Sequence, residues 1–224
     1  MKSLFQVTAS APDRSLLTLP ELRATIGIPD HSEDAALQLL GNRLADRIAR
    51  ACKVGIDGAT PPTLREETIL ETFRLGAGGV GRARGFHHFD DVLAIQDLVL
   101  GRRPIVSVAS IVEDCYTLDA DDFEIHSGAG MLLRLWDDFP ACWLPVKVVV
   151  GYTAGWATVP DGLRTAAERL ARYYWFRDMR DPALKQISLA GIGSRSFESQ
   201  PATDPDVPAD VMDMLAPFVN TAIG

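Results

Sequence analysis

The sequence has few cysteines and no long apolar run, and each absence excludes a class of protein. Its three cysteines, Cys52, Cys115 and Cys142, form no C-x-x-C pair, and an odd number argues against a disulfide-stapled secreted domain. The most apolar stretch, residues 143–152, is broken by a proline and a lysine and is far shorter than the ~18 residues that a membrane span needs. The amino terminus turns polar before a signal-peptide h-region forms. We therefore expect a protein made in a cytoplasm, with no membrane partner.

Basic residues are also in the minority. Thirty acidic against 22 basic residues give a net charge of −8, so the overall charge does not favour binding to nucleic acid or to an anionic membrane. Hydrophobic residues make up 47% of the 224, which is ordinary for a globular chain that buries a real core. We expect a single domain over residues 1–224.

Motifs that would carry chemistry are weak. The run Gly76–Gly81 matches G-x-G-x-x-G after a predicted strand, but no helix opens behind it to bind a pyrophosphate, so a nucleotide-binding enzyme is the weaker alternative to a loop. Residues 87–91 include His87, His88, Asp90 and Asp91, but neighbours on a strand point to opposite faces and rarely bind one ion. No Gly-x-Ser-x-Gly elbow is present. The sequence therefore predicts no catalytic residues, no cofactor and no metal site.

Helical periodicity appears at both ends of the chain. Residues 18–53 predict a short helix, opened by a Thr18–Glu21 capping box and ended by Gly27, then a longer helix capped by Asp30 or Ser32. A second long helix is predicted from Asp161 to about residue 181, and a short one over 209–222. The apolar stripes of the two long helices are Leu37, Leu40, Leu44, Ile48 and Cys52, and Leu163, Ala166, Ala167, Leu170 and Tyr174.

Between the helices the pattern is typical of strands. Candidates lie at residues 68–75, 95–100, 105–112, 123–126, 131–135 and 146–152, with turn-forming runs at 119–122 and 127–130. No helix-length segment intervenes, which favours an antiparallel meander over a parallel doubly wound sheet. Residues 188–208 are predicted as a loop or arm. The expected fold is α+β: a helical core (18–53 and 160–181), an inserted antiparallel sheet (63–152), and an extended carboxy-terminal arm and helix (188–224).

Aromatic residues gather in the second half of the chain. Residues 173–176 are Tyr-Tyr-Trp-Phe, and a helix cannot hide four consecutive side chains on one face. A partner subunit could cover some of them. A helix at the centre of its own monomer would account for them equally well. We predict an interface formed by Tyr173, Trp175, Ile192, Phe197, Met214, Leu215 and Phe218.

Several segments, taken together and in order, resemble head-to-tail connector (adaptor) proteins of tailed bacteriophages, which prophages and gene transfer agents also carry. The amino-terminal matches are Thr18–Arg23 with Asp34–Leu37, and the matches around the predicted sheet are Arg103–Val108 and Val148–Trp156. The carboxy-terminal matches are the helix Leu163–Asp178, the arm Ile192–Phe197 and the terminal segments Pro208–Val211 and Leu215–Phe218. Together they cover most of the chain. The long stretch from about Thr63 to Gly101 departs from the shorter members.

The resemblance implies a structural virion protein at the head-to-tail interface. Its ring, usually of twelve copies, would bind beneath the portal protein and present a docking surface to the stopper or tail. DNA would pass through the lumen without sequence-specific binding, and a negative lumen would let it slide. We expect the arm and helix from Ser188 onward to dock on the portal or a neighbour, with a folded core left when 188–224 is deleted. A tail-completion or tail-terminator ring is the alternative.

Overall fold

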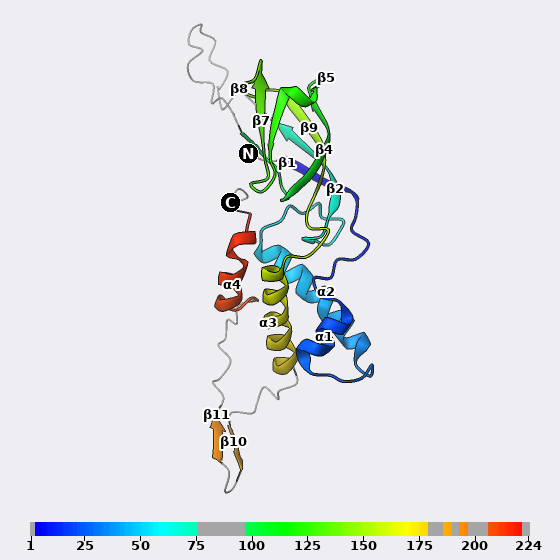
Figure 1. Cartoon of the computed structure of the whole chain (residues 1–224), viewed down its shortest axis with the longest axis vertical. Coiled ribbons are helices and arrows are strands. Elements are labelled where there is room, and N and C mark those ends of the chain that lie inside the picture. The colour runs from blue at the N-terminus through cyan, green and yellow to red at the C-terminus, as the bar shows by residue number, and fades with distance from the viewer. Residues whose placement is uncertain (1–2, 76–96, 179–185, 190–192, 197–205, 221–224) are drawn as a thin grey trace. The chain divides into compact units, whose positions relative to one another are not determined.

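The computed structural model describes residues 3–75, 97–178, 186–189, 193–196 and 206–220 (Figure 1). The chain divides into two compact units. The β unit comprises residues 1–14, 53–158 and 220–224, and the helical unit comprises residues 15–52 and 159–219. Helices and antiparallel sheets occur together, so the predicted α+β class is confirmed. The single-domain assignment stays a prediction.

The helical unit begins with α1 (Leu19–Ile26) and α2 (Asp34–Ala51). The capping box at α1 is as predicted: the Glu21 amide donates to Thr18 Oγ1 at 3.4 Å, and Glu21 Oε2 accepts from the Thr18 amide at 2.7 Å. Gly27 ends α1 in the left-handed region, with φ 86°. The predicted cap of α2 is wrong. Glu33 occupies that position without a side-chain cap bond, because the Asp30 carboxylate instead accepts from the Ser32 amide and hydroxyl.

Helix α3 (Asp161–Asp178) is followed in the described chain by a small hairpin and by α4. The hairpin pairs β10 (Gln186–Leu189) with β11 (Gly193–Ser196), where the sequence predicted an irregular arm. Helix α4 (Ala209–Leu215) ends in a 3₁₀ turn, η3 (Ala216–Phe218), so the last helix is shorter than predicted. The predicted stripes of α2 and α3 are buried, except that Leu40 is only half-buried.

The larger sheet of the β unit has the order β1-β2-β9-β4-β5, with every pair antiparallel. Its strands are β1 (Ser3–Ala9), β2 (Glu67–Arg74), β4 (Ile105–Glu113), β5 (Tyr116–Thr117) and β9 (Lys147–Ala154). The sequence did not predict β1. The central strand β9 pairs with β2 and β4, both distant in sequence.

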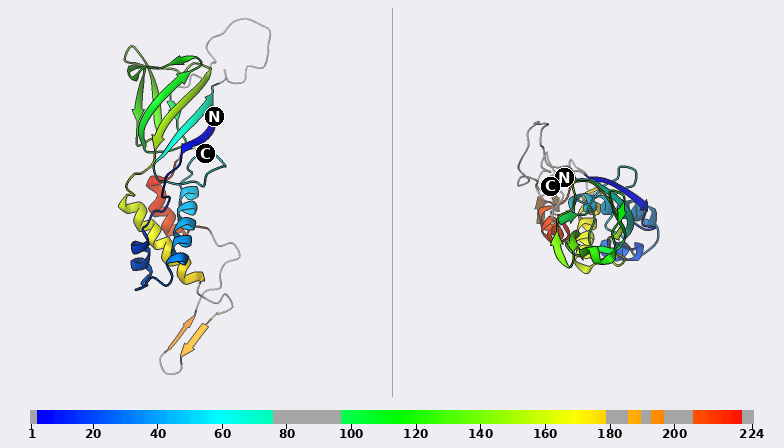
Figure 2. Two further views of the ribbon diagram at one scale, coloured as in Figure 1. Left: turned by 90° about the vertical axis from the view of Figure 1, so that its right-hand side faces the viewer. Right: turned by 90° about the horizontal axis from the view of Figure 1, so that it is seen from above.

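The smaller sheet has the order β3-β7-β6, with β8 paired to β7. It contains β3 (Asp97–Val99), β6 (Phe123–His126), β7 (Met131–Trp136) and β8 (Phe139–Ala141), and the 3₁₀ turn η2 (Ala120–Asp122) precedes β6. The predicted antiparallel pairing of neighbouring strands is confirmed for β6 and β7, whereas β8 was not predicted. In the larger sheet, long-range pairing instead joins β2 to β9. Figures 1 and 2 show the two sheets of this unit facing each other.

An apolar core fills the space between the two sheets. It includes Phe73 from β2, Leu98 from β3, Ile111 from β4, Leu132 from β7 and Val150 from β9, all with at most 1% of their surface exposed. Side chains alternate between the two faces of a strand, and Ile69 and Phe73 of β2 and Val148, Val150, Tyr152 and Ala154 of β9 face this core. No helix in the described part of the chain is long and apolar enough to cross a membrane.

Candidate assembly interface

The predicted interface residues that the structure describes all lie in the helical unit. Tyr173 and Trp175 are in the last turns of α3, Met214 and Leu215 end α4, and Phe218 ends η3. Ile192 and Phe197 lie outside the described residues. Helices α3 and α4 pack against each other, so the two groups of predicted residues belong to neighbouring elements.

Tyr174 anchors the chain that leads into α4. Two guanidinium groups lie over its ring, with the Arg47 carbon 4.1 Å and the Arg177 carbon 5.0 Å from the ring centroid. Its hydroxyl donates to the backbone carbonyl of Asp206, and Asp206 also pairs with Arg47 at 3.9 Å. Burial raises the pKa of Tyr174, so the phenol remains a proton donor near neutral pH.

The apolar face of α4 is covered by its own chain. Val211 and Leu215 are buried, and the Arg169 guanidinium on α3 pairs with Asp210 at 2.5 Å. The Phe218 ring lies 3.5 Å from the point where a side chain at Gly162 would begin. Leu215 therefore packs inside the unit and has no surface to offer a partner while α4 stays docked.

Exposed apolar surface remains beside this packing. Phe176 and Met212 are exposed, and Tyr173, Trp175, Met214 and Phe218 are half-buried. Of the four consecutive aromatics, only Tyr174 is buried, as the geometry of a helix requires. The interface itself stays a prediction. Leu215 is buried within its own unit, which the sequence did not indicate because helical spacing shows an apolar face and not what covers it.

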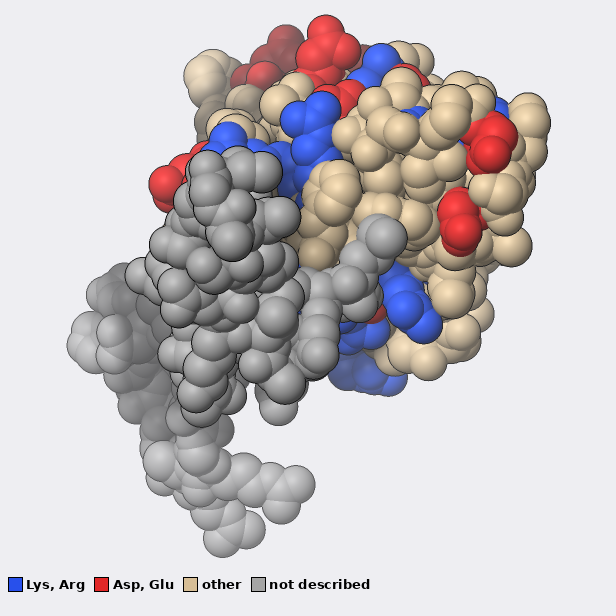
Figure 3. Space-filling model, turned by 90° about the horizontal axis from the view of Figure 1, so that it is seen from below, with Lys and Arg blue, Asp and Glu red and all other residues tan. Residues whose placement is uncertain are grey.

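The arginines of the helical unit are largely paired within it. Arg164 pairs with Glu21 at 3.3 Å, Arg50 with Asp46 at 2.9 Å, and Arg23 with Asp34 at 3.5 Å. On the face drawn in Figure 3, basic side chains lie in separate groups with acidic and uncharged residues between them. The described residues of that face therefore form no continuous basic surface for a phosphate backbone.

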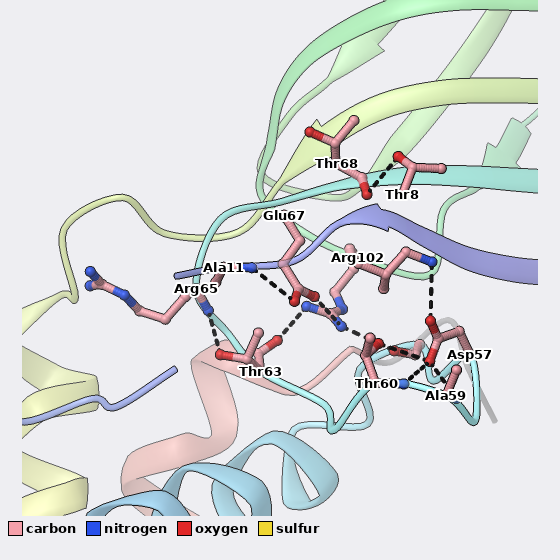
Figure 4. A network of polar contacts seen from close by, with 12 residues as sticks. Thr8, Ala11, Asp57, Ala59, Thr60, Thr63, Arg65, Glu67, Thr68 and Arg102 are labelled. Atoms are coloured by element: carbon pink, nitrogen blue, oxygen red, sulfur yellow. Dashed lines mark hydrogen bonds and ion pairs between the residues drawn. The ribbon is translucent and has the colours of Figure 1, made fainter. Parts of the chain in front are cut away.

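The β unit contains a buried ion pair that the sequence analysis missed (Figure 4). Arg102 Nη2 lies 3.0 Å from Glu67 Oε2, and both side chains are almost completely buried. Arg102 also donates to the backbone carbonyls of Thr63 and Gly55, and Glu67 Oε1 accepts from the Ala11 amide at 3.3 Å. Burial lowers the pKa of Arg102, and the Glu67 carboxylate opposes that change. Through these contacts the ion pair connects β2 to the chain around Ala11, Gly55 and Thr63.

A second buried carboxylate, Glu71, lies on the same face of β2. It accepts hydrogen bonds from the Gly101 amide at 2.9 Å, the Tyr152 hydroxyl at 2.8 Å and the Ser3 hydroxyl at 2.5 Å. Burial raises the pKa of Glu71 above its ordinary value, and these hydrogen bonds oppose the rise. The sequence did contain an indication of this burial. Glu67 and Glu71 alternate with the same period of two as Ile69 and Phe73, so all four side chains lie on the face of β2 that points to the core.

Both carboxylates make contacts that organise the fold. Their partners are backbone amides, hydroxyls and one arginine of the same unit. Among the described residues, no group of three His, Cys, Asp or Glu side chains could hold a metal ion. The Gly76–Gly81 motif and the His87–Asp91 run lie outside the described residues, so the structure does not test them.

Comparison with solved structures identifies the fold. A chain from the neck of an empty gene transfer agent (GTA) particle, computed with C6 symmetry, superposes with a TM-score of 0.52 at 17% identity. The match covers 96% of this chain and 94% of that one. The fold is that of a GTA neck protein.

Two further structures of these particles are similar to the chain. One is the virion of a native gene transfer agent, with a TM-score of 0.49, 18% identity, and coverage of 84% of this chain and 89% of that one. The other is the neck of a native GTA particle computed with C12 symmetry, with a TM-score of 0.44, 16% identity, and coverage of 80% and 86%. No family model matches the chain, and no curated protein matches it.

Proposed function

We propose that the chain is a structural neck protein of a virion or gene transfer agent particle, and specifically the head-to-tail adaptor. In this role it forms a ring beneath the portal, extends the DNA channel and carries the docking surface for the stopper or tail. The observation that carries the proposal is the fold match to a GTA neck protein over nearly the whole length of both chains.

A ring is consistent with the surfaces of the helical unit. Ring subunits contact their neighbours through two different surfaces, and such heterologous contacts close by rotation. Exposed and half-buried apolar residues along α3, α4 and η3 are candidates for such contacts: Tyr173, Trp175, Phe176, Met212, Met214 and Phe218. We assign them to contacts with the neighbouring subunits or the portal.

The hairpin of β10 and β11 is the second candidate contact. In the described chain these strands pair only with each other. A two-stranded hairpin is at best marginally stable alone in water, so a partner surface would stabilise it. We propose that it docks on the portal or on an adjacent subunit, as the resemblance implied for the arm.

The charge balance fits a channel through which DNA slides. With a net charge of −8, the chain repels phosphate and does not hold it. We propose that DNA passes the ring without sequence-specific contacts, and that the protein acts without a cofactor and as a component of the particle, after assembly in the host cytoplasm.

The test is native mass spectrometry of the purified chain mixed with the portal protein of the same genome. We expect a discrete complex with about one copy of this chain per portal subunit, on the order of twelve copies in a ring. Deletion of residues 186–196 should abolish the complex, whereas Leu39→Ala, an exposed change on α2, should leave it intact.

The outcomes separate the adaptor from its neighbours in the tail. Failure to bind an intact portal, together with capture of tail proteins by the same preparation, would identify a tail-completion or tail-terminator ring. Nucleotide affinity lost on Gly78→Val and Gly81→Val would instead support the enzyme alternative.

A further inference from the structure

One end of the β unit carries four large apolar side chains that the unit does not cover. Tyr116 is 74% exposed, Trp136 and Phe139 are each 72% exposed, and Leu144 is 56% exposed. We call these four residues the apolar tip. Scattered apolar residues are ordinary on protein surfaces, but a cluster of aromatics marks an interaction site.

The turn between β7 and β8 brings two of these side chains together. Trp136 and Phe139 are directly opposite each other across a two-residue turn, so their side chains lie on the same face. Asp137 and Asp138 form the turn with φ of 53° and 64°, the left-handed values of a tight type I′ hairpin. The two side chains therefore project from the same face at the end of a short two-stranded ribbon.

Contacts at the base of the tip join this hairpin to the β4–β5 hairpin. Glu113, which pairs with Tyr116 across the β4–β5 turn, lies 3.5 Å from the Arg134 guanidinium on β7. Glu113 Oε1 also accepts from the Leu144 amide at 2.9 Å. Arg134 donates further to the carbonyls of Asp122 and Leu135 at 2.7 and 2.6 Å. Glu113 and Arg134 are nearly buried, so the tip is fixed before any partner binds.

The surroundings of the tip carry more acidic than basic side chains. Residues 113–144 contain one Lys or Arg, Arg134, and eight carboxylates: Glu113, Asp114, Asp119, Asp121, Asp122, Glu124, Asp137 and Asp138. Lys147 and Arg74 are exposed beside this segment, at the start of β9 and the end of β2, so the carboxylates outnumber the basic groups there. Arg134 is already engaged by Glu113 and Asp122. This charge repels nucleic acid and anionic lipid, and it attracts a basic protein surface.

A second copy of this chain is a poor match for the tip. Two tips would repel each other, and Arg23, Arg50, Arg164 and Arg169 of the helical unit are already paired with carboxylates of their own unit. Because these four arginines already have carboxylate partners, we assign the complementary surface to a different protein.

We propose that the apolar tip docks into an apolar pocket with a basic rim on a different protein of the particle. The proposal rests on the proposed function for the identity of that protein, whereas the chemistry of the contact comes from the tip itself. Trp136 and Phe139 enter the pocket, and the carboxylates around them pair with lysines or arginines of its rim.

The first experiment maps the contact in cells that produce the particles. Phe139 is replaced by p-benzoylphenylalanine and cross-linked by light, with the same replacement at Val106, an exposed β4 residue, as the control. We expect a cross-link from position 139 to a Lys- or Arg-rich peptide of another particle protein. Cross-links to DNA or to this chain, or a yield no higher than at position 106, would overturn the proposal.

The second experiment measures affinity with the purified cross-linked protein as the probe. We expect Trp136→Ala with Phe139→Ala to weaken binding at least ~10-fold, as loss of central aromatic anchors does. Asp137→Asn with Asp138→Asn keeps residues that tolerate the left-handed turn, so it should mainly reduce the salt dependence of binding. Val106→Ala should have no effect. Unchanged affinity in the double alanine variant would overturn the proposal.

Incorporation of this chain into the purified particles is measured separately in the same cells. Purified particles that lack this chain would contradict the proposed function, whereas the cross-link from position 139 reports on the tip in either case. The two failures are therefore distinguishable.

Discussion

At the scale of the residue, the least ordinary feature of this protein is a group of charged side chains buried beside the apolar core of the β unit. Arg102 and Glu67 are paired with almost no exposed surface, and Glu71 lies on the same strand face. Leaving one member of such a pair alone is costly, because an uncompensated charge then remains buried. These residues should therefore affect stability far more than the charges at the surface.

We predict that Arg102→Ala destabilises the protein by about 3–5 kcal/mol, because it leaves Glu67 unpaired and frees the carbonyls of Thr63 and Gly55. Denaturant unfolding measures the change. Arg50→Ala is the matched control, since it removes an ion pair with Asp46 that is exposed to solvent and contributes little to stability. Similar denaturant concentrations at the unfolding midpoint for the two variants would contradict this prediction.

The buried carboxyl of Glu71 makes the stability of the folded protein depend on pH. Its pKa is raised in the folded state, so between its ordinary value of 4.5 and the raised value the folded chain binds more protons than the unfolded chain. Stability contributed by this group is therefore complete below pH 4.5 and is lost as the pH rises through that window, with a slope of at most about 1.4 kcal/mol per pH unit.

We expect Glu71→Gln to remove this contribution. Its amide oxygen can accept from the Gly101 amide and Tyr152, and its amide nitrogen can donate to Ser3, so the contacts survive without the titrating group. Unfolding free energies measured from pH 4 to 8 should show a flatter profile than the native chain, with Glu33→Gln as an exposed control. Parallel profiles for Glu71→Gln and the native chain would refute this assignment.

At the scale of the element, strand β1 is held by a slot that only glycine can form. A side chain at Gly55 would begin 2.8 Å from the Phe5 ring, and one at Gly101 would begin 2.9 Å from it. The Arg102 guanidinium also lies 5.6 Å from the ring centroid. Two glycines far apart in sequence therefore fix the edge strand of the larger sheet.

We predict that Gly55→Ala or Gly101→Ala displaces Phe5 and destabilises the protein by about 1–3 kcal/mol, as overpacking does. Thermal unfolding detects the loss, and amide exchange along β1 localises it. Gly128→Ala is the control, because nothing lies within 4 Å of a side chain at that position. If the Gly55→Ala and Gly101→Ala variants were as stable as Gly128→Ala, the Phe5 ring would be able to move aside at no cost, and the prediction would be wrong.

At the scale of the whole molecule, α4 and the β10–β11 hairpin have different consequences when removed. Helix α4 contributes Val211 and Leu215 to the packing of its own unit, and Tyr174 and Arg169 hold the chain at Asp206 and Asp210. The hairpin pairs only with itself in the described residues. The expectation that a folded core survives loss of residues 188–224 therefore needs revision.

We predict that truncation after residue 205 destabilises the helical unit by several kcal/mol, roughly that of two large-to-small core changes at 2–5 kcal/mol each. Deletion of residues 186–196 should leave the melting temperature nearly unchanged. Calorimetry on both variants checks this, and a shared loss of stability would mean that the hairpin packs on the folded chain.

Much of the secondary structure could be predicted because its causes are local. The capping box of Thr18 and Glu21, the end of α1 at Gly27 and the apolar stripes of α2 and α3 depend on residues within a turn or two of each other. The hairpin of β6 and β7 likewise follows from the turn-forming residues 127–130 between two neighbouring strands. Strand β1 was missed because an edge strand with one half-exposed face has a weak apolar pattern.

The sequence by itself determined the α+β class, the order of the four helices and of β2, β3, β4, β6, β7 and β9, and the presence of more aromatic residues in α3 than one helix face can hide. Only the tertiary structure decided that β9 lies between β2 and β4, that Arg102 meets Glu67, and that α4 covers its own unit. The physical reason is distance along the chain. Periodicity and capping act between near neighbours, whereas strand pairing, buried ion pairs and helix docking join segments whose meeting depends on how the whole chain packs.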